Sequence, residues 1–203
     1  MQIIYKDSLE KEVNEAKALL LEEYSKVFVE VGGLIKKEEI YVKNKLERID
    51  YYKDNDEMED NVITKLQTYE VPFAIRKRKQ YGNFTLINVN TYAKNQLTGK
   101  WKFLADANDF LLCTQPIDLD SGEPIYLQTT KYLGEYSNDL DPNYCKFNYD
   151  REGNFTYCDY NYVRDYENEI FELDRLPVIK EKFDLTDEMY NYYLTADLLP
   201  PLK

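Results

Sequence analysis

Apolar residues near the start of the chain recur at the spacing of an α-helix. Asp7 precedes them as a helix N-cap, with Glu10 three residues later as its capping-box partner. The pattern predicts an amphipathic helix over residues 8–25, preceded by a short strand over residues 2–6. The residues that share its apolar face are Leu9, Val13, Ala16, Leu20 and Tyr24.

From residue 26 onwards the apolar pattern changes to a period of two, which is typical of strands. Gly, Asn and Asp clusters separate the strands, and an acidic run over 54–60 reads as a loop or a helix start, with 61–69 left ambiguous. Thr186 caps a predicted helix that continues to about Leu198. The predicted strands are 27–31, 34–42, 46–53, 71–79, 84–92, 101–105, 109–114, 124–133, 145–149, 154–163 and 168–173.

These elements predict one α+β domain over residues 1–203. Its sheet is expected to be mostly antiparallel, built from meanders and hairpins, with an N-terminal amphipathic helix and a short C-terminal helix. No long Ser, Gly or Pro linker interrupts the chain. A subdivision near residue 100 is the alternative, because the charge changes there.

Charge is distributed very unevenly along the sequence. Residues 1–101 contain 17 Lys and Arg and 17 Asp and Glu, whereas residues 102–203 contain 9 and 21, which accounts for the whole net charge of −12. Residues 135–175 combine 11 acids with seven tyrosines. Such a chain repels nucleic-acid phosphate and anionic lipid and attracts basic partners.

Several kinds of catalytic and metal site are excluded or disfavoured. The chain has no histidine, which removes Ser-His-Asp and Cys-His nucleophiles and His-ligated zinc. No glycine-rich phosphate loop is present. Asp139, Asp141 and Asn143 start a calcium-loop spacing, but Tyr144 occupies the position that needs glycine. We therefore expect no cofactor and no metal.

The three cysteines, Cys113, Cys145 and Cys158, are few and odd in number, which favours free thiols in a reducing compartment. Cys145 and Cys158 flank a predicted turn over 150–153, and the hairpin register decides whether they can pair. The N-terminal residues show no signal peptide and no apolar run could span a membrane. We expect a cytoplasmic protein without membrane contact.

One basic block, Arg76-Lys77-Arg78-Lys79, lies on a predicted strand. Such a block can mark a nucleic-acid interface. In a chain that is otherwise acidic, a solvated strand end that pairs with the chain's own carboxylates is the preferred interpretation.

The function hypothesis that fits best is a small acidic cytoplasmic protein that inhibits or neutralises a basic partner, such as a toxin or a nucleic-acid enzyme. Carboxylates steer association, and tyrosines offer stiff contact area. An immunity-type inhibitor is one form of this hypothesis, and a nucleic-acid mimic is another. The predicted contact residues are Asp159, Tyr160, Tyr162, Asp165, Tyr166, Glu167 and Glu169, with a second patch at Asp54, Asp56, Glu57, Glu59 and Asp60.

Two other classes remain open. One is a structural or scaffold component of a phage or bacterial assembly, in which the charge would serve solubility only. The other is an enzyme or small-ligand binder that uses carboxylates. The identity of the partner, the binding face and the oligomeric state lie beyond what the sequence predicts.

Overall fold

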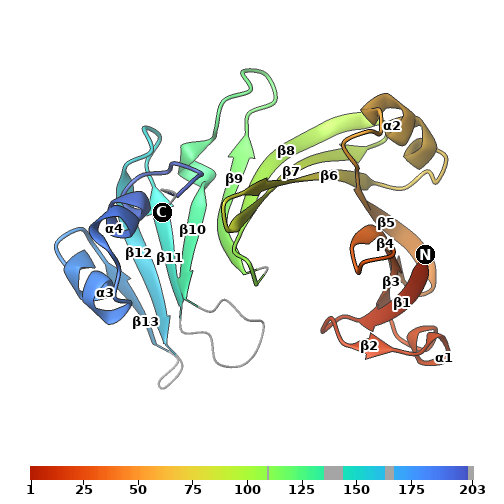
Figure 1. Cartoon of the computed structure of the whole chain (residues 1–203), viewed down its shortest axis with the longest axis horizontal. Coiled ribbons are helices and arrows are strands. Elements are labelled where there is room, and N and C mark those ends of the chain that lie inside the picture. Colours follow the sequence, from red (N-terminus) through yellow and green to blue (C-terminus); the bar gives the residue numbers. More distant parts are fainter. Residues whose placement is uncertain (109, 135–143, 163–166, 201–203) are drawn as a thin grey trace. The chain divides into compact units, whose positions relative to one another are not determined.

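A computed structural model describes residues 1–108, 110–134, 144–162 and 167–200 (Figure 1). Strands dominate these residues, and the helices are short. The first part of the chain forms β1 (Gln2–Asp7), β2 (Glu12–Val13), α1 (Glu15–Ala18), β3 (Glu23–Val29), β4 (Ile35–Val42), β5 (Lys45–Tyr52), α2 (Glu59–Gln67) and β6 (Phe73–Tyr81). The rest forms β7 (Phe84–Ala93), β8 (Gln96–Ala105), β9 (Leu111–Ile117), the 3₁₀ turn η1 (Tyr126–Gln128), β10 (Thr130–Gly134), β11 (Tyr144–Tyr149), β12 (Phe155–Tyr162), β13 (Glu167–Phe171), α3 (Leu176–Lys182) and α4 (Asp187–Tyr193).

The described strands hydrogen-bond in the order β13-β12-β11-β10-β9-β8-β7-β6-β5-β4-β3-β1-β2. Pairing is antiparallel from β1 to β5 and from β8 to β13, whereas β5 and β6 are parallel. A parallel pair needs a crossover, and α2 supplies it. The α+β class and the mostly antiparallel sheet are confirmed. The predicted hairpin over 71–79 and 84–92 corresponds to β6 and β7.

The chain divides into two compact units. Unit 1 comprises residues 1–78 and 88–99, and unit 2 comprises residues 79–87 and 100–203. In unit 1, Val62 and Leu66 of α2 are buried against apolar side chains of β5 and β6. The cluster consists of Ile49, Tyr51, Val62, Leu66, Phe73 and Ile75.

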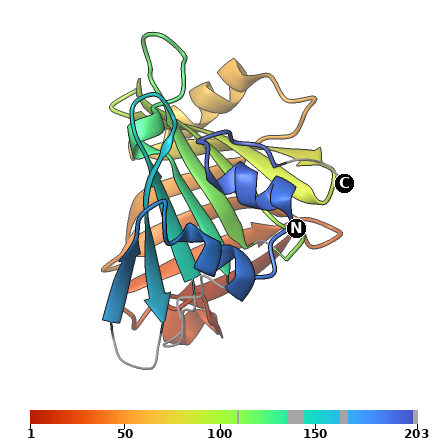
Figure 2. The same cartoon turned by 90° about the vertical axis from the view of Figure 1, so that its left-hand side faces the viewer.

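In unit 2, α3 and α4 cover one face of β11–β13 (Figures 1 and 2). The core between them is rich in aromatic rings, and the Tyr149 hydroxyl donates a hydrogen bond to the Tyr193 carbonyl at 3.1 Å. The Phe147 and Tyr193 rings stack with centroids 4.6 Å apart. The buried residues are Cys145, Phe147, Tyr149, Cys158, Tyr160, Phe171, Leu176, Ile179, Tyr192, Tyr193 and Ala196.

The predicted amphipathic helix over 8–25 is wrong. Asp7 does not cap a helix; its Oδ1 accepts from the backbone N–H groups of Leu9 and Lys11 and so closes a turn between β1 and β2. Helix α1 has only four residues, and Leu20, on the supposed apolar face, is 87% exposed. Residues from Glu23 onwards belong to strand β3, which pairs with β1, so they do not form the last part of the predicted helix.

At the other end of the chain, Thr186 caps α4 as predicted, since its hydroxyl accepts from the backbone N–H of Met189. Helix α4 is shorter than expected and ends at Tyr193. Helix α3 was not predicted from the sequence, and it buries Leu176 and Ile179. No helix in the described part of the chain is long and apolar enough to cross a membrane.

Candidate functional site

The first predicted contact set lies on β12 and β13 and on the connection between them. The register pairs Tyr160 with Glu169 and Tyr162 with Glu167, so these backbone positions are neighbours across the two strands. Asp165 and Tyr166 lie outside the described residues. Strand β13 is the last strand in the sheet order.

Two members of this set are less available than predicted. Tyr160 is only 3% exposed, with its ring against Phe171 and Phe183 and the Lys182 ammonium 4.3 Å from its centroid. Asp159 is half-buried, and its Oδ2 accepts from Asn148 Nδ2 at 3.2 Å. Alternation along β12 placed the tyrosine ring inward, so Tyr160 is a core residue rather than a contact residue.

The second predicted patch lies on the loop after β5 and in the first turn of α2, and much of its charge is used within unit 1. The Lys36 ammonium binds the carboxylates of both Asp54 and Glu57. Glu57 also accepts from the Tyr51 hydroxyl at 2.5 Å and from the Asp54 backbone N–H at 2.8 Å.

These contacts shift the ionisation of the groups concerned. Burial alone would raise the pKa of Glu57, but the hydrogen bonds from Lys36, Tyr51 and the Asp54 N–H lower this pKa to about 2. Burial and the hydrogen bond to Glu57 raise the pKa of Tyr51 to about 12. Burial opposes the charge on Lys36, yet its two carboxylate partners raise its pKa above the ordinary value. The group is therefore a structural ion cluster.

The three remaining carboxylates of the second patch differ in whether they have partners within the protein. Glu59 accepts from Asn90 Nδ2 at 2.8 Å and from the Tyr92 hydroxyl at 3.4 Å, which joins α2 to β7. Asp56 and Asp60 are exposed, and no ion pair involving them occurs among the residues that the structure describes. Two of the five predicted carboxylates are thus free to meet a partner.

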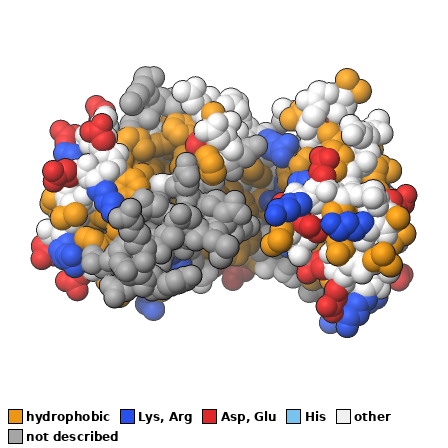
Figure 3. All heavy atoms as spheres, turned by 90° about the horizontal axis from the view of Figure 1, so that it is seen from below, with side chains coloured by type: hydrophobic (Ala, Val, Ile, Leu, Met, Phe, Trp, Pro, Cys, Tyr) orange, Lys and Arg blue, Asp and Glu red, His pale blue; other side chains and the backbone are white. Residues whose placement is uncertain are grey.

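The α3–α4 end of unit 2 carries exposed acids that the sequence analysis did not single out. Asp187 binds Lys180, but five others form no ion pair within the described part of the chain. Figure 3 shows red Asp and Glu side chains at this end, together with blue Lys and Arg side chains. The five exposed acids are Glu172, Asp174, Glu181, Asp184 and Glu188.

A buried lysine is the second feature that was missed. Lys131 of β10 is 0% exposed and lies between Cys113 of β9 and Phe147 of β11. Its ammonium donates to the carbonyls of Tyr192 and Thr195 at 2.5 and 2.8 Å. Burial lowers its pKa to about 7. In sequence, Thr-Lys-Tyr-Leu gives no sign that this lysine points inward.

The cysteines form no disulfide. Cys145 pairs with Tyr160 and Cys158 with Phe147, so the two cysteines are diagonal neighbours on one face rather than direct partners. Burial raises the pKa of Cys113 to about 12, which makes it a poor nucleophile. In the described residues, no group of three or more Cys, Asp or Glu side chains could hold a metal ion.

Two acidic runs, one that starts at Asp118 and one that starts at Asp139, have the front end of a calcium-loop spacing. Asp118 closes a turn, because its Oδ1 accepts from the backbone N–H groups of Asp120 and Ser121. The run from Asp139 to Asn143 lies outside the described residues.

Compared with known proteins, the chain matches no protein-family model, no curated protein and no solved structure.

Proposed function

We propose that this protein is a small acidic binding protein of the cytoplasm that neutralises a basic partner, as an inhibitor or an immunity-type protein of a bacterium or phage would. The observation that carries the proposal is the division of charge between the two units. Unit 1 contains 15 Lys and Arg and 17 Asp and Glu, whereas unit 2 contains 11 and 21. Unit 2 therefore holds most of the negative charge.

The position of these acids supports an interface rather than internal pairing. The free acids at α3–α4 follow directly on β13, which carries the predicted contact residues Glu167 and Glu169. Exposed carboxylates near one end of a unit give a directed field, which raises association rates with a cationic surface. Replacing phosphates by carboxylates in the same way would make the surface a nucleic-acid mimic.

The proposal is tested by charge reversal of Asp165, Glu167 and Glu169 to lysine. A basic protein retained from host lysate at low salt is purified, and its affinity is measured between 50 and 300 mM NaCl. We expect the variant to lose at least about tenfold in affinity and much of the salt dependence. The matched control reverses three exposed acids of unit 1, namely Glu12, Glu23 and Glu70 to lysine, so that both variants change the net charge equally.

Equal loss in both variants, or no loss in the β13 variant, would show that the acidic end of unit 2 is not the interface.

A second candidate function has one specific observation in its favour. Ile170 and Leu173, on and just after the edge strand β13, are 60% and 62% exposed. Exposed apolar side chains at an edge strand favour pairing between copies, as in a structural assembly. A defined oligomer in the absence of any partner, measured by light scattering, would support that alternative.

A further inference from the structure

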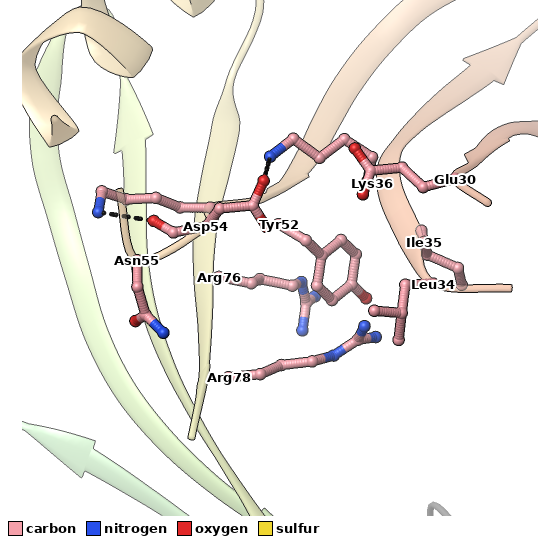
Figure 4. A pocket seen from close by; sticks show the side chains of 10 residues that line it. Glu30, Leu34, Ile35, Lys36, Tyr52, Asp54, Asn55, Arg76 and Arg78 are labelled. Atoms are coloured by element: carbon pink, nitrogen blue, oxygen red, sulfur yellow. Dashed lines mark hydrogen bonds and ion pairs between the residues drawn. The ribbon is translucent and has the colours of Figure 1, made fainter. Parts of the chain in front are cut away.

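A small pocket in unit 1 presents two arginines from one strand. Arg76 and Arg78 are two positions apart on β6 and so project from the same face. The parallel pairing of β5 with β6 places Tyr52 beside Arg76. The pocket has a volume of about 150 Å³, and Leu34 and Ile35 form its apolar wall (Figure 4).

The two guanidinium groups are held in different ways. Arg76 donates through Nε and Nη2 to Asp50 Oδ2 at 2.9 and 2.5 Å, which leaves its Nη1 edge unused. The Asp50 carboxylate is also bound by Arg48, so one carboxylate serves two arginines. Arg78 lies 4.1 Å from the Tyr52 ring centroid and forms no ion pair within the described residues.

Among the described residues, neither of the two carboxylates that line the pocket, Glu30 and Asp54, forms an ion pair with Arg76 or Arg78. Asp54 is bound to Lys36, and Lys53 donates to its backbone carbonyl at 3.1 Å. Glu30 is drawn beside Lys36, whereas the ends of Arg76 and Arg78 lie close to each other near the Tyr52 ring (Figure 4). Four cations and two carboxylates line the pocket. Asp50 and Glu57, outside this lining, bind Arg76 and Lys36, so Arg78 is the lining guanidinium without a carboxylate partner in the described part of the chain.

We propose that this pocket binds a phosphate group, either as inorganic phosphate or as the terminal group of a small phosphorylated molecule. A guanidinium fork matches phosphate oxygens, and stacking on an aromatic ring orders the fork before binding. Asp50 already accepts from Arg48 and from Arg76, so the Arg78 fork and the remaining edge of Arg76 are left to meet a ligand. Two neighbouring guanidinium groups offer several donors to the several oxygens of a phosphate dianion. The volume is below the roughly 300–1,000 Å³ of pockets that enclose drug-sized ligands, so only the charged group is enclosed.

This site lies in unit 1, and it does not depend on the acidic interface proposed for unit 2. The test is titration with inorganic phosphate, adenosine monophosphate and acetate at pH 7.5 and constant ionic strength. Binding is followed by calorimetry and by NMR shifts of the Arg78 Nε–H and the Tyr52 amide. We expect saturable binding of phosphate or the nucleotide, with acetate at least about tenfold weaker.

The decisive variant is Arg78→Gln, because among the described residues Arg78 has no carboxylate partner that the substitution would leave unpaired. Its affinity for phosphate is expected to fall at least about tenfold, while its ligand-free melting temperature stays within about 3 °C of the original. The matched control is Lys77→Gln, an exposed cation on the opposite face of β6, with affinity changed less than about twofold. If Arg78→Gln does not fold, Arg78→Lys keeps the charge without the fork and should bind several-fold more weakly.

The relative affinities of the two phosphate ligands identify the source of the group. Tighter binding of the nucleotide supports a phosphorylated small molecule, and tighter binding of inorganic phosphate supports the free ion. The proposal is overturned if neither binds saturably, if acetate binds equally well, or if Arg78→Gln and Lys77→Gln bind alike.

Discussion

Replacing the buried Lys131 by methionine should remove a specific pH dependence of stability. The pKa of this lysine is about 7 in the folded protein, against 10.5 in its ordinary environment. The ammonium contacts the carbonyls of Tyr192 and Thr195 and the Tyr192 ring at 3.2 Å, and the Cys113 thiol and the Asp197 carboxylate act on it electrostatically. Between the two pKa values the unfolded chain binds more protons than the folded protein, so the free energy of unfolding rises with pH.

The magnitude follows from the two pKa values. At pH 7 the lowered pKa of Lys131 costs about 4.4 kcal/mol of stability, and at pH 8.5 it costs about 2.7 kcal/mol. The original protein should therefore gain about 1.7 kcal/mol relative to K131M over this interval. At pH 7 the absolute effect of K131M is smaller than that cost, because the two carbonyls lose their donor, at about 1–3 kcal/mol each.

The assay is urea denaturation of both proteins at pH 7.0, 7.5, 8.0 and 8.5. The buried Cys113 and the other shared titrations cancel in the difference between the two proteins. A difference in unfolding free energy that stays constant within about 0.5 kcal/mol would refute the reasoning, since it would show that Lys131 keeps its proton or is not buried. If K131M does not fold, the rise with pH in the original protein alone is still measurable.

Three further outcomes can be checked on the same material. E57Q should remove a loss of stability at low pH. With the Glu57 pKa at about 2, the unfolding free energy of the original protein should fall by about 2 kcal/mol more than that of E57Q between pH 7 and pH 3, measured by urea denaturation. Gly153 has a φ of +87°, and a Cβ there would lie 3.3 Å from the Tyr126 ring, so G153A should lower the free energy of unfolding by about 2–4 kcal/mol. Gly122 has a φ of +76° and open space, so in thermal unfolding G122A should cost only about 1–2 kcal/mol. Thiol titration of the denatured, unreduced protein should give three groups, because all three cysteines are free thiols and Cys145 and Cys158 are not directly opposite each other across the β11–β12 pair; one group would contradict this.

The sheet was predictable where the residues that decide it are close in sequence. The β6–β7 hairpin follows from two period-two runs around Gly82, and the Thr186 cap follows from the residues just after it. The N-terminal helix failed for the opposite reason. Its helical spacing was real, but pairing with β3 outweighed a local preference that amounts to only tenths of a kcal/mol per residue. Helix α3 was missed because its burial depends on the core of unit 2.

The candidate surfaces were predictable only as composition. The sequence located the excess of acid in the second half of the chain, but it could not distinguish the inward ring of Tyr160 from an outward one, or foresee that Lys36 would take up Asp54 and Glu57. Both results depend on which strand lies beside which. A carboxylate near an ammonium is indistinguishable in composition from a carboxylate that faces water.

The cationic pocket shows that the partners of basic residues were also not predictable from the sequence. The basic block was expected to pair with the chain's own acids, and Arg76 does bind Asp50. Arg78 does not, because the parallel β5–β6 pair brings it to the Tyr52 ring instead of to a carboxylate. The crossover through α2 creates this neighbourhood from residues 24 to 26 positions apart. A strongly acidic protein can thus hold a local anion site, because a charge within hydrogen-bond reach outweighs charges beyond a Debye length of about 8 Å.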